Sequence, residues 1–304
     1  MIRELVILGA GPAGVSAALW ARSLHLDVML LEGSGESGGQ LLSVHFHPRE
    51  LPGLIAGDGA AIAATYAQQL AEAGIPTRYE ACAEALIAGG ERPAIRLANG
   101  ERVEASALLI ACGARRRKLG VPGEDAFADR GLSYSATRDL ESLAGRRVVV
   151  VGGGDGAYEN ALMLAAAGCD VTLVARGEPR ARLEFRGRVA EEPRITVELG
   201  ARVLAVVGDS MVRAVRVTGP AGERDLACEG VVVKVGVLPN TEWCREGLAH
   251  DEAGYLKVSS TFETSEPTIW AAGDIVRPAL ASVSVAAGQG ALAVAAIRAR
   301  LRGQ

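Results

Sequence analysis

LVILGAGPAG, residues 5–14, joins a short apolar run to a glycine-rich turn near the start of the chain. An alanine-rich helical stretch follows to about Leu24, and a second apolar run, 28–31, ends at Glu32, eighteen residues after Gly14. A strand, a GxGxxG turn, a helix, a strand and an acid in this order and spacing are typical of a unit that binds a dinucleotide. The opening of the chain therefore predicts an α/β fold built on a Rossmann-type unit.

Each glycine of this motif has a separate expected role. Gly9 permits the tight turn, Gly11 lets the backbone approach a pyrophosphate, and Gly14 lets the helix pack closely on the strand. The helix N-terminus supplies free N–H groups and a positive dipole for the phosphates. The acid is expected to bind ribose hydroxyls. The predicted contacts of the first nucleotide are Gly9, Gly11, Pro12, Ala13, Gly14 and Glu32.

The same arrangement occurs a second time. The apolar run 148–151 leads into GGGDGA, residues 152–157, a GxGxxA variant, and a helix and the strand 171–174 follow. Eighteen residues after Ala157 the chain has Ala175 instead of an acid, and three arginines come next. Arginines in place of the acid suit a 2′-phosphate, which favours NADPH over NADH; a solvated loop is the alternative. The predicted contacts of the second nucleotide are Gly152, Gly154, Asp155, Gly156, Ala157, Arg176, Arg180 and Arg182.

Two such units, 143 residues apart between Gly9 and Gly152, predict two nucleotides on one chain. A bound flavin dinucleotide, FAD, and an exchangeable nicotinamide nucleotide are the expected pair, and together they indicate hydride transfer. The protein then supplies positioning and electrostatics, so no catalytic acid or base is assigned. No metal site is assigned either, because His45 and His47 have no third ligand near them in the sequence.

The composition agrees with a globular protein, and 304 residues allow about two domains. The chain is 49% hydrophobic and 22% charged, which excludes a disordered chain and a coiled coil. Its net charge of −4 gives no basic field that would attract nucleic acid or acidic lipid. Neither nucleic acid nor a membrane is therefore expected as a partner.

Five widely spaced cysteines, with no CxxC among them, indicate reduced thiols and a cytoplasmic protein. The stretch 278–297 has twenty residues without a formal charge, which is the length of a membrane span. It is rich in Ala, Ser, Val and Gly, and Gly288-Gln289-Gly290 interrupts it. This content favours a buried helix.

Beyond the first motif, the sequence resembles the low-molecular-weight thioredoxin reductases. GGQL at 38–41 and LIACGA at 109–114 resemble segments of the family's FAD-binding half, with Cys112 where threonine is usual. VGVLPNT at 235–241 and IWAAGD at 269–274 resemble its GxxPNT and IYAAGD segments. The resemblance implies FAD contacts at Gly33, Gly39, Gln40, Leu41, Ala111, Gly113, Gly273 and Asp274, and at Ser282 and Val283 where the last helix would begin.

The resemblance also implies two Rossmann-type, three-layer domains, of which the second is inserted into the first. The FAD-binding domain is expected at 1–117 and 244–304, and the NAD(P)H-binding domain at 118–243. The chain would pass from the first domain into the second and back again. The polar, turn-forming stretch 115–123 agrees with the first of these two crossings, and residues 238–240 agree with the second. A homodimer is implied as well.

One part of the family's pattern is absent. Thioredoxin reductases carry Cys-x-x-Cys-Asp ahead of the second glycine motif, where this chain has Ser135-Ala136-Thr137-Arg138-Asp139. Without those two cysteines the flavin cannot pass electrons through an internal disulfide. The usual thioredoxin reductase mechanism is therefore not expected.

Three functional hypotheses remain open. The stretch 134–156 resembles the ferredoxin (flavodoxin)–NADP reductases of the thioredoxin reductase type, which also lack the disulfide, so ferredoxin or flavodoxin is the leading expected partner. The second hypothesis is a thioredoxin reductase-like enzyme that acts directly on a small disulfide, thiol or quinone at the flavin. The third is a non-catalytic flavin redox sensor.

Overall fold

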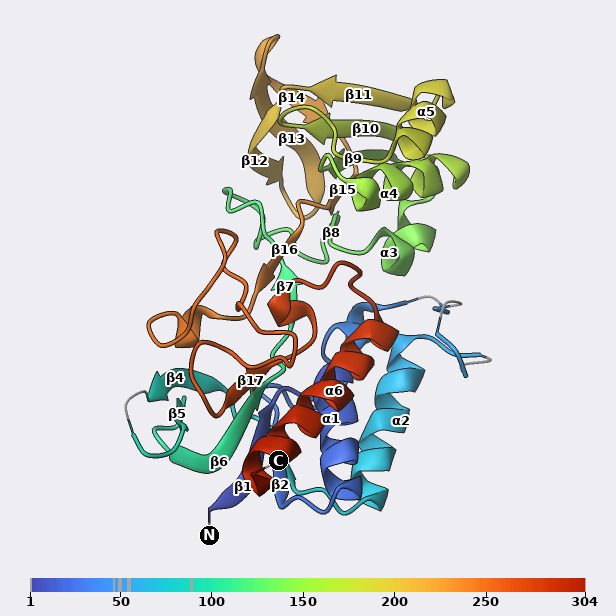
Figure 1. The fold of residues 1–304 in the computed structure, drawn as a ribbon. Coiled ribbons are helices and arrows are strands. Elements are labelled where there is room, and N and C mark those ends of the chain that lie inside the picture. The colour runs from blue at the N-terminus through green and yellow to red at the C-terminus, as the bar shows by residue number, and fades with distance from the viewer. Residues whose placement is uncertain (1, 46, 49–50, 54–55, 88–89, 304) are drawn as a thin grey trace. The chain divides into compact units, whose positions relative to one another are not determined.

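The computed structural model describes residues 2–45, 47–48, 51–53, 56–87 and 90–303. The chain divides into two compact units, one made of Met1–Arg115 and Leu238–Gln304 and the other of Arg116–Val237 (Figure 1). At the crossings, β7 (Ala114–Arg116) and β16 (Val237–Pro239) pair as a two-stranded sheet. The inserted unit therefore ends at Val237, six residues before the boundary at 243 expected from the sequence.

The discontinuous unit is built on a seven-stranded sheet in the order β3-β2-β1-β6-β5-β4, with β17 also paired to β6. Strands β3, β2, β1, β6 and β17 are parallel, whereas β4 and β5 form an antiparallel hairpin. Residues 102–104 of β6 pair with β5, and residues 108–110 pair with β17. The strands are β1 (Arg3–Leu8), β2 (Val28–Leu31), β3 (Thr77–Arg78), β4 (Ala83–Ile87), β5 (Ala94–Leu97), β6 (Arg102–Ile110) and β17 (Ile269–Ala271).

Alternate residues of these strands point to opposite faces of the sheet. Leu5 and Ile7 of β1 pack in one core with residues of three helices, and Figure 1 shows these helices on one face. Val6 and Leu8 pack in a second core with the hairpin and the loop that contains Leu248. The helices are α1 (Pro12–Ser23), α2 (Gly59–Glu72) and α6 (Val283–Arg302), and the short 3-10 turns are η1 (Gly39–Ser43), η2 (Glu242–Cys244) and η3 (Asp274–Val276).

Small residues let α1 and α6 approach each other closely. A Cβ atom on Gly290 of α6 would lie 2.1 Å from the carbonyl oxygen of Ala13 in α1. Ser16 Oγ also donates a hydrogen bond to the Ala287 carbonyl oxygen at 2.8 Å. The uncharged stretch thus supplies most of α6, but only one face of this helix is buried, since Leu292 on the other face is 62% exposed. Of the helices in the described residues, none has the length and apolar content that crossing a membrane requires.

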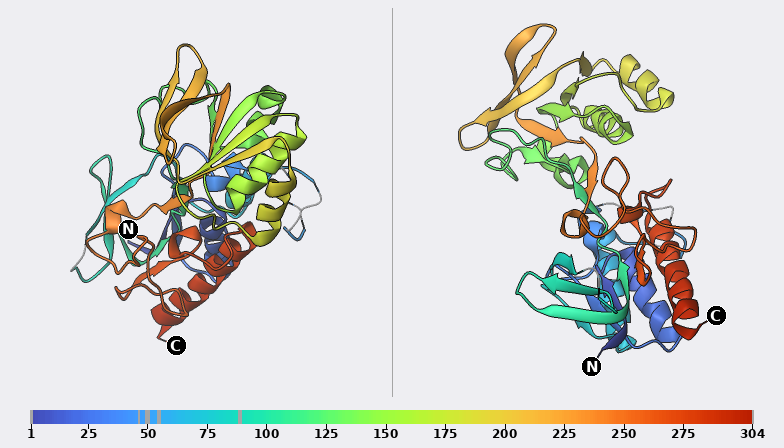
Figure 2. Two further views of the ribbon diagram at one scale, coloured as in Figure 1. Left: turned by 90° about the horizontal axis from the view of Figure 1, so that it is seen from above. Right: turned by 60° about the vertical axis from the view of Figure 1, so that its left-hand side comes forward.

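The inserted unit is built on a five-stranded parallel sheet in the order β11-β10-β9-β15-β8. Val148 and Val150 of β9 pack with the helices, whereas Val149 and Val151 pack with an antiparallel meander on the opposite face (Figure 2). The helices are α3 (Ala136–Leu143), α4 (Asp155–Ala166) and α5 (Leu183–Glu191). The sheet strands are β8 (Leu132–Ser133), β9 (Arg147–Val151), β10 (Asp170–Ala175), β11 (Ile195–Leu199) and β15 (Gly230–Val233), and the meander is β12 (Arg202–Gly208), β13 (Val212–Gly219) and β14 (Gly222–Ala227).

Both units therefore have a parallel sheet with helices on one face and antiparallel strands on the other. This three-layer architecture confirms the predicted pair of Rossmann-type folds, and the carboxyl ends of the parallel strands are where such folds bind ligands.

Replacing Gly290 with alanine should destabilise the protein. The added methyl group would overlap the Ala13 carbonyl oxygen, and overpacking of this kind costs about 1–3 kcal/mol. Gly288→Ala on the same helix is the matched control, because no atom lies within 4 Å of its added Cβ. The control should be neutral or stabilised by about 0.5–1 kcal/mol through helix propensity. Thermal unfolding measures both, and equal midpoints for the two variants would contradict the packing described here.

Candidate functional site

The first glycine motif lies at the carboxyl ends of β1 and β6. Gly9 has a φ of +104°, and a Cβ atom on it would lie 2.5 Å from the carbonyl oxygen of Ala111, the residue that follows β6. A Cβ atom on Gly14 would lie 1.8 Å from the Gly9 carbonyl oxygen. Neither place has room for a side chain, so the chain turns tightly and α1 starts against the end of the strand.

Gly11 differs from these two glycines because the space in front of it is open. The nearest atom to a Cβ on Gly11 would be the Gly38 carbonyl oxygen, at 4.0 Å. Gly11 is also the N-cap of α1, and no side chain accepts a hydrogen bond from the first N–H groups of that helix. The first N–H groups of the helix have no side-chain acceptor, and no side chain at Gly11 blocks the way to them, so a phosphate group can bind there. The residues present therefore fit the pyrophosphate of a dinucleotide.

Glu32 follows β2 and holds the edge of the glycine loop. Its Oε2 accepts a hydrogen bond from the Ala10 N–H at 2.6 Å, and its Oε1 accepts one each from the N–H and the hydroxyl of Ser34, both at 2.8 Å. A carboxylate has about four lone-pair sites, so these bonds leave capacity for another donor. Gly33 comes next, and a Cβ atom on it would lie 3.7 Å from the sulfur of Cys82.

The GGQL segment reaches the same loop. A Cβ atom on Gly39 would lie 3.4 Å from the Cα of Gly11. Gln40 Nε2 donates a hydrogen bond to Asp274 Oδ2 at 2.6 Å, which joins residues 234 positions apart. Leu41 is buried at 2% exposure and anchors the turn. The structure thus brings the first motif, the GGQL segment and the AAGD segment together.

The start of α6 completes this arrangement. Gly273 has a φ of +85°, and its N–H donates to Oε1 of Gln289 at 2.8 Å. Gln289 has no role in the sequence-based assignment; its one signal is an amide inside the uncharged part of the helix, ahead of Arg298. Ser282 caps α6 by accepting a hydrogen bond from the Val285 N–H at 3.2 Å, and Val283 is the first helical residue.

Ala111 and Gly113 have different surroundings, although both follow β6. The Ala111 N–H donates to the Leu8 carbonyl oxygen at 2.7 Å, which places Ala111 at the glycine loop. Gly113 has a φ of +61°, and its carbonyl oxygen accepts a hydrogen bond from the Asn240 N–H at 3.0 Å. Gly113 therefore ties the outgoing crossing to the returning one.

The second glycine motif repeats this geometry at the carboxyl ends of β9 and β15. A Cβ atom on Gly152 would lie 2.2 Å from the carbonyl oxygen of Lys234, the residue that follows β15. Gly154 is the N-cap of α4 and makes no side-chain cap bond, and neither Gly154 nor Gly156 has an atom within 4 Å of an added Cβ. Ala157 is buried beneath the turn at 1% exposure. The N-terminus of α4 thus fits a second pyrophosphate.

The three arginines after β10 have different contacts. Arg182 donates from its Nε to Asp155 Oδ2 and from its backbone N–H to Asp155 Oδ1, both at 2.8 Å. Arg182 therefore braces the loop against the start of α4. Arg176 and Arg180 are exposed, and among the described residues no carboxylate pairs with either guanidinium. They are the two arginines whose charge is free for a ligand.

The two positions where the resembled family has cysteines have structural contacts in this chain. Ser135 is the N-cap of α3, and its Oγ accepts a hydrogen bond from the Arg138 N–H at 3.4 Å. Arg138 Nη2 contacts Asp129 Oδ1 at 2.6 Å and Asp139 Oδ2 at 2.8 Å. Neither side chain can be oxidised to a disulfide.

The cysteine thiols are all unpaired. Burial raises the pKa of the Cys112 thiol far above its ordinary range, and Cys112 Sγ donates to the Leu8 carbonyl oxygen at 3.5 Å. Burial also raises the pKa of Cys228 and of Cys244 to about 12. These three thiols stay protonated at neutral pH and are poor nucleophiles, whereas Cys82 is exposed.

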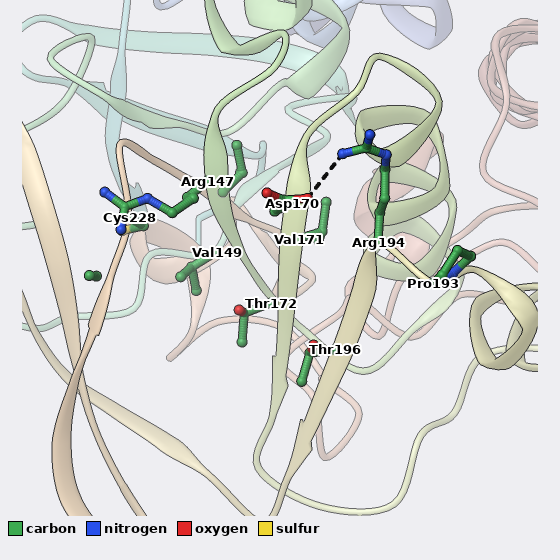
Figure 3. Close-up of a pocket in the computed structure, with 11 residues that line it drawn as sticks. Arg147, Val149, Asp170, Val171, Thr172, Pro193, Arg194, Thr196 and Cys228 are labelled. Atoms are coloured by element: carbon green, nitrogen blue, oxygen red, sulfur yellow. Dashed lines mark hydrogen bonds and ion pairs between the residues drawn. The ribbon is translucent and has the colours of Figure 1, made fainter.

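A hollow of about 280 Å³ opens at the opposite end of the second unit's sheet. Figure 3 shows Arg147 and Arg194 on its two sides, with Thr172 and Thr196 between them and Arg194 Nη1 bound to Asp170 Oδ1 at 3.0 Å. This hollow lies by the amino ends of β9 and β10, away from the glycine motif. It is therefore separate from the candidate nucleotide site.

Comparisons with known proteins agree with this arrangement. The model of the family "Pyridine nucleotide-disulphide oxidoreductase" matches residues 3–290. Thioredoxin reductase from Coxiella burnetii is 33% identical, covering 95% of this chain and 93% of that protein. Thioredoxin reductase from Streptomyces clavuligerus is 31% identical, covering 95% of this chain and 91% of that protein. The crystal structure of Lactococcus lactis thioredoxin reductase matches with a TM-score of 0.84 and 27% identity, covering 99% of this chain and 100% of that one.

The chain therefore belongs to the pyridine nucleotide-disulphide oxidoreductase family. It is a thioredoxin reductase-like flavoprotein, an FAD-dependent oxidoreductase whose second nucleotide is NADPH. This confirms the predicted enzyme class and both cofactors.

Thiol titration should find one rapidly reacting cysteine in the folded protein. At neutral pH, an aromatic disulfide reagent should modify Cys82 within seconds and the other thiols only on unfolding, because exposure and thiolate content set the rate. Cys82→Ser should remove the fast phase, and Cys112→Ser should leave it unchanged. Two or more fast thiols would show that a buried cysteine is more reactive than its surroundings indicate.

Proposed function

We propose that this enzyme uses NADPH to reduce its FAD and that the reduced flavin then passes the two electrons directly to a small disulfide or quinone, with no redox disulfide of its own. The observation that carries the proposal is the pair of contacts at positions 135 and 138. Ser135 caps a helix and Arg138 pairs with two aspartates, where an internal relay would need two cysteines.

The residues of the discontinuous unit support a bound FAD. Gly9, Gly11 and Gly14 would hold the pyrophosphate at the start of α1, and Glu32 would hold the ribose beside it. Asp274 and Gln40, joined to each other at 2.6 Å, would position the rest of the cofactor near the start of α6. When bound, FAD accepts a hydride from the nicotinamide and delivers the electrons to the acceptor.

The residues of the inserted unit support NADPH in the same way. Gly154 and Gly156 would admit the pyrophosphate to the start of α4, and Asp155 would fix the adjoining loop through Arg182. Arg176 and Arg180 would then bind the 2′-phosphate, because a guanidinium binds phosphate oxygens through charge-assisted hydrogen bonds.

The relatives described above favour a disulfide acceptor over ferredoxin or flavodoxin, since both are thioredoxin reductases. Arg115 could attract an acidic ferredoxin only if its charge were free, but it is bound to Glu242 and to the Asn240 side chain. The family assignment also favours an enzyme over a redox sensor. A homodimer and a cytoplasmic location remain predictions.

Replacing Arg176 and Arg180 together with glutamine should raise the KM for NADPH about ten- to a hundredfold, because two charge-assisted hydrogen bonds to the 2′-phosphate are lost. The KM for NADH, which has no 2′-phosphate, should stay within about twofold. Arg188→Gln, at an exposed position on α5, is the matched control and should change neither value. Parallel losses for NADPH and NADH would place the 2′-phosphate elsewhere.

Stopped-flow reoxidation of the NADPH-reduced holoenzyme tests the acceptor. Low-molecular-weight disulfides or quinones should speed the return of oxidised flavin in proportion to their concentration, whereas ferredoxin and flavodoxin should not. Acceleration by ferredoxin or flavodoxin alone would replace the proposal with the one-electron reductase. A flavin that NADPH fails to reduce would favour a sensor.

A further inference from the structure

Lys234 follows the last residue of β15 and has no place in the function proposed above. Its carbonyl oxygen closes the second glycine motif, 2.2 Å from where a Cβ on Gly152 would be. Its Nζ donates a hydrogen bond at 3.0 Å to the carbonyl oxygen of Tyr134, which follows the neighbouring strand β8. The ammonium group therefore lies at the carboxyl edge of the parallel sheet, beside the glycine motif.

A second cation lies close to it. Arg116 at the end of β7 is half-buried, and its charge acts on Lys234. In the described parts of the chain, neither side chain forms an ion pair with a carboxylate, and Glu159 on α4 is the acid whose charge reaches Lys234. Arg138 on α3, whose charge reaches Arg116, is paired with aspartates. Among the described residues, Lys234 and Arg116 are thus two cations at this edge of the sheet that no carboxylate pairs with, although Glu124 accepts a hydrogen bond from the Tyr134 hydroxyl nearby.

The strand order indicates which half of the nucleotide meets this charge. In the order β11-β10-β9-β15-β8, the pyrophosphate belongs at the end of β9 and the adenosine half at the end of β10, where Arg176 lies. The other half of the dinucleotide must then extend over the ends of β15 and β8, since a dinucleotide crosses the point where strand order reverses. Lys234 and Tyr134 are the residues at those ends.

We propose that Lys234, with Arg116 beside it, is a specificity-determining residue that makes the inserted unit bind the reduced nicotinamide nucleotide in preference to the oxidised one. The inference rests on the proposed NADPH site. The dihydronicotinamide ring is neutral and the oxidised ring carries a positive charge. Nearby unpaired cations therefore weaken the binding of the oxidised nucleotide and leave that of the reduced nucleotide unchanged. The consequence for the enzyme is faster exchange of spent NADP⁺ for NADPH.

The preference should depend on pH because burial and Arg116 lower the pKa of Lys234 to about 8, with Glu159 acting in the opposite direction. Below that pKa the ammonium is charged and repels the oxidised ring. Above it the amine is neutral and that repulsion is lost. The preference for the reduced form should therefore fall as pH rises from 7 to 9.

The test measures two dissociation constants on the oxidised holoenzyme by calorimetry. The probes are NADP⁺ and 1,4,5,6-tetrahydro-NADP, whose ring is neutral and cannot donate a hydride. At pH 7 the tetrahydro form should bind about tenfold more tightly, a ratio consistent with one close charge pair near a protein surface. Lys234→Gln should lower the ratio about three- to fivefold, leaving the smaller contribution of Arg116, and Lys234→Arg should keep the ratio while abolishing its pH dependence.

Binding of 2′,5′-ADP, which lacks the nicotinamide half, separates the possible failures. Its affinity should be equal in the wild-type enzyme and in Lys234→Gln, which also shows that the variant is folded. An unchanged ratio of the two probes in Lys234→Gln, with normal 2′,5′-ADP binding, would overturn the role of Lys234 and leave the proposed function standing. Absence of 2′,5′-ADP binding to the wild-type enzyme would overturn the NADPH site itself, and with it this inference.

Discussion

Both units depend on the same close contact between a glycine and a neighbouring strand. The glycine that follows the first strand of each motif lies directly against a carbonyl oxygen at the end of the adjacent strand, that of Ala111 for Gly9 and that of Lys234 for Gly152. A side chain at either glycine would separate the strands or displace the turn. Because the contact is made, each helix starts within a few residues of the sheet edge, and its N-terminal N–H groups are directed to the place where phosphate must lie.

The local parts of this arrangement can be read from the sequence because they depend on neighbouring residues. The two glycine motifs, the small residues of α6 and the Rossmann-type class all follow from short-range patterns. The contacts of Gln289 and Arg182 do not, because each joins segments that meet only in the folded chain. The end of the inserted unit at Val237 depends in the same way on the pairing of β16 with β7.

The two positions at which the resemblance implies a redox disulfide have contacts that stabilise the local fold in this chain. A serine that caps a helix and an arginine that pairs with two carboxylates occupy the two positions, so the start of α3 is held by polar contacts instead of a covalent bridge. Arg116, Arg138 and Lys234 also lie close enough together for their charges to interact, since burial and the charge of Arg138 lower the pKa of Arg116, and burial and the charge of Arg116 lower the pKa of Lys234.

One edge of β6 lies along β1, and the division of its other edge between β5 and β17 has a consequence for biosynthesis. Its first residues pair with β5, made just before it, but its last residues pair with β17, which the ribosome adds about 160 residues later. The inserted unit is continuous in sequence, so it can complete its own sheet while the first unit still has an open strand edge. Until Ile269–Ala271 emerges, that edge is available to other extended chains. The nascent protein therefore carries an open strand edge through much of its translation, from the synthesis of β6 until β17 is made.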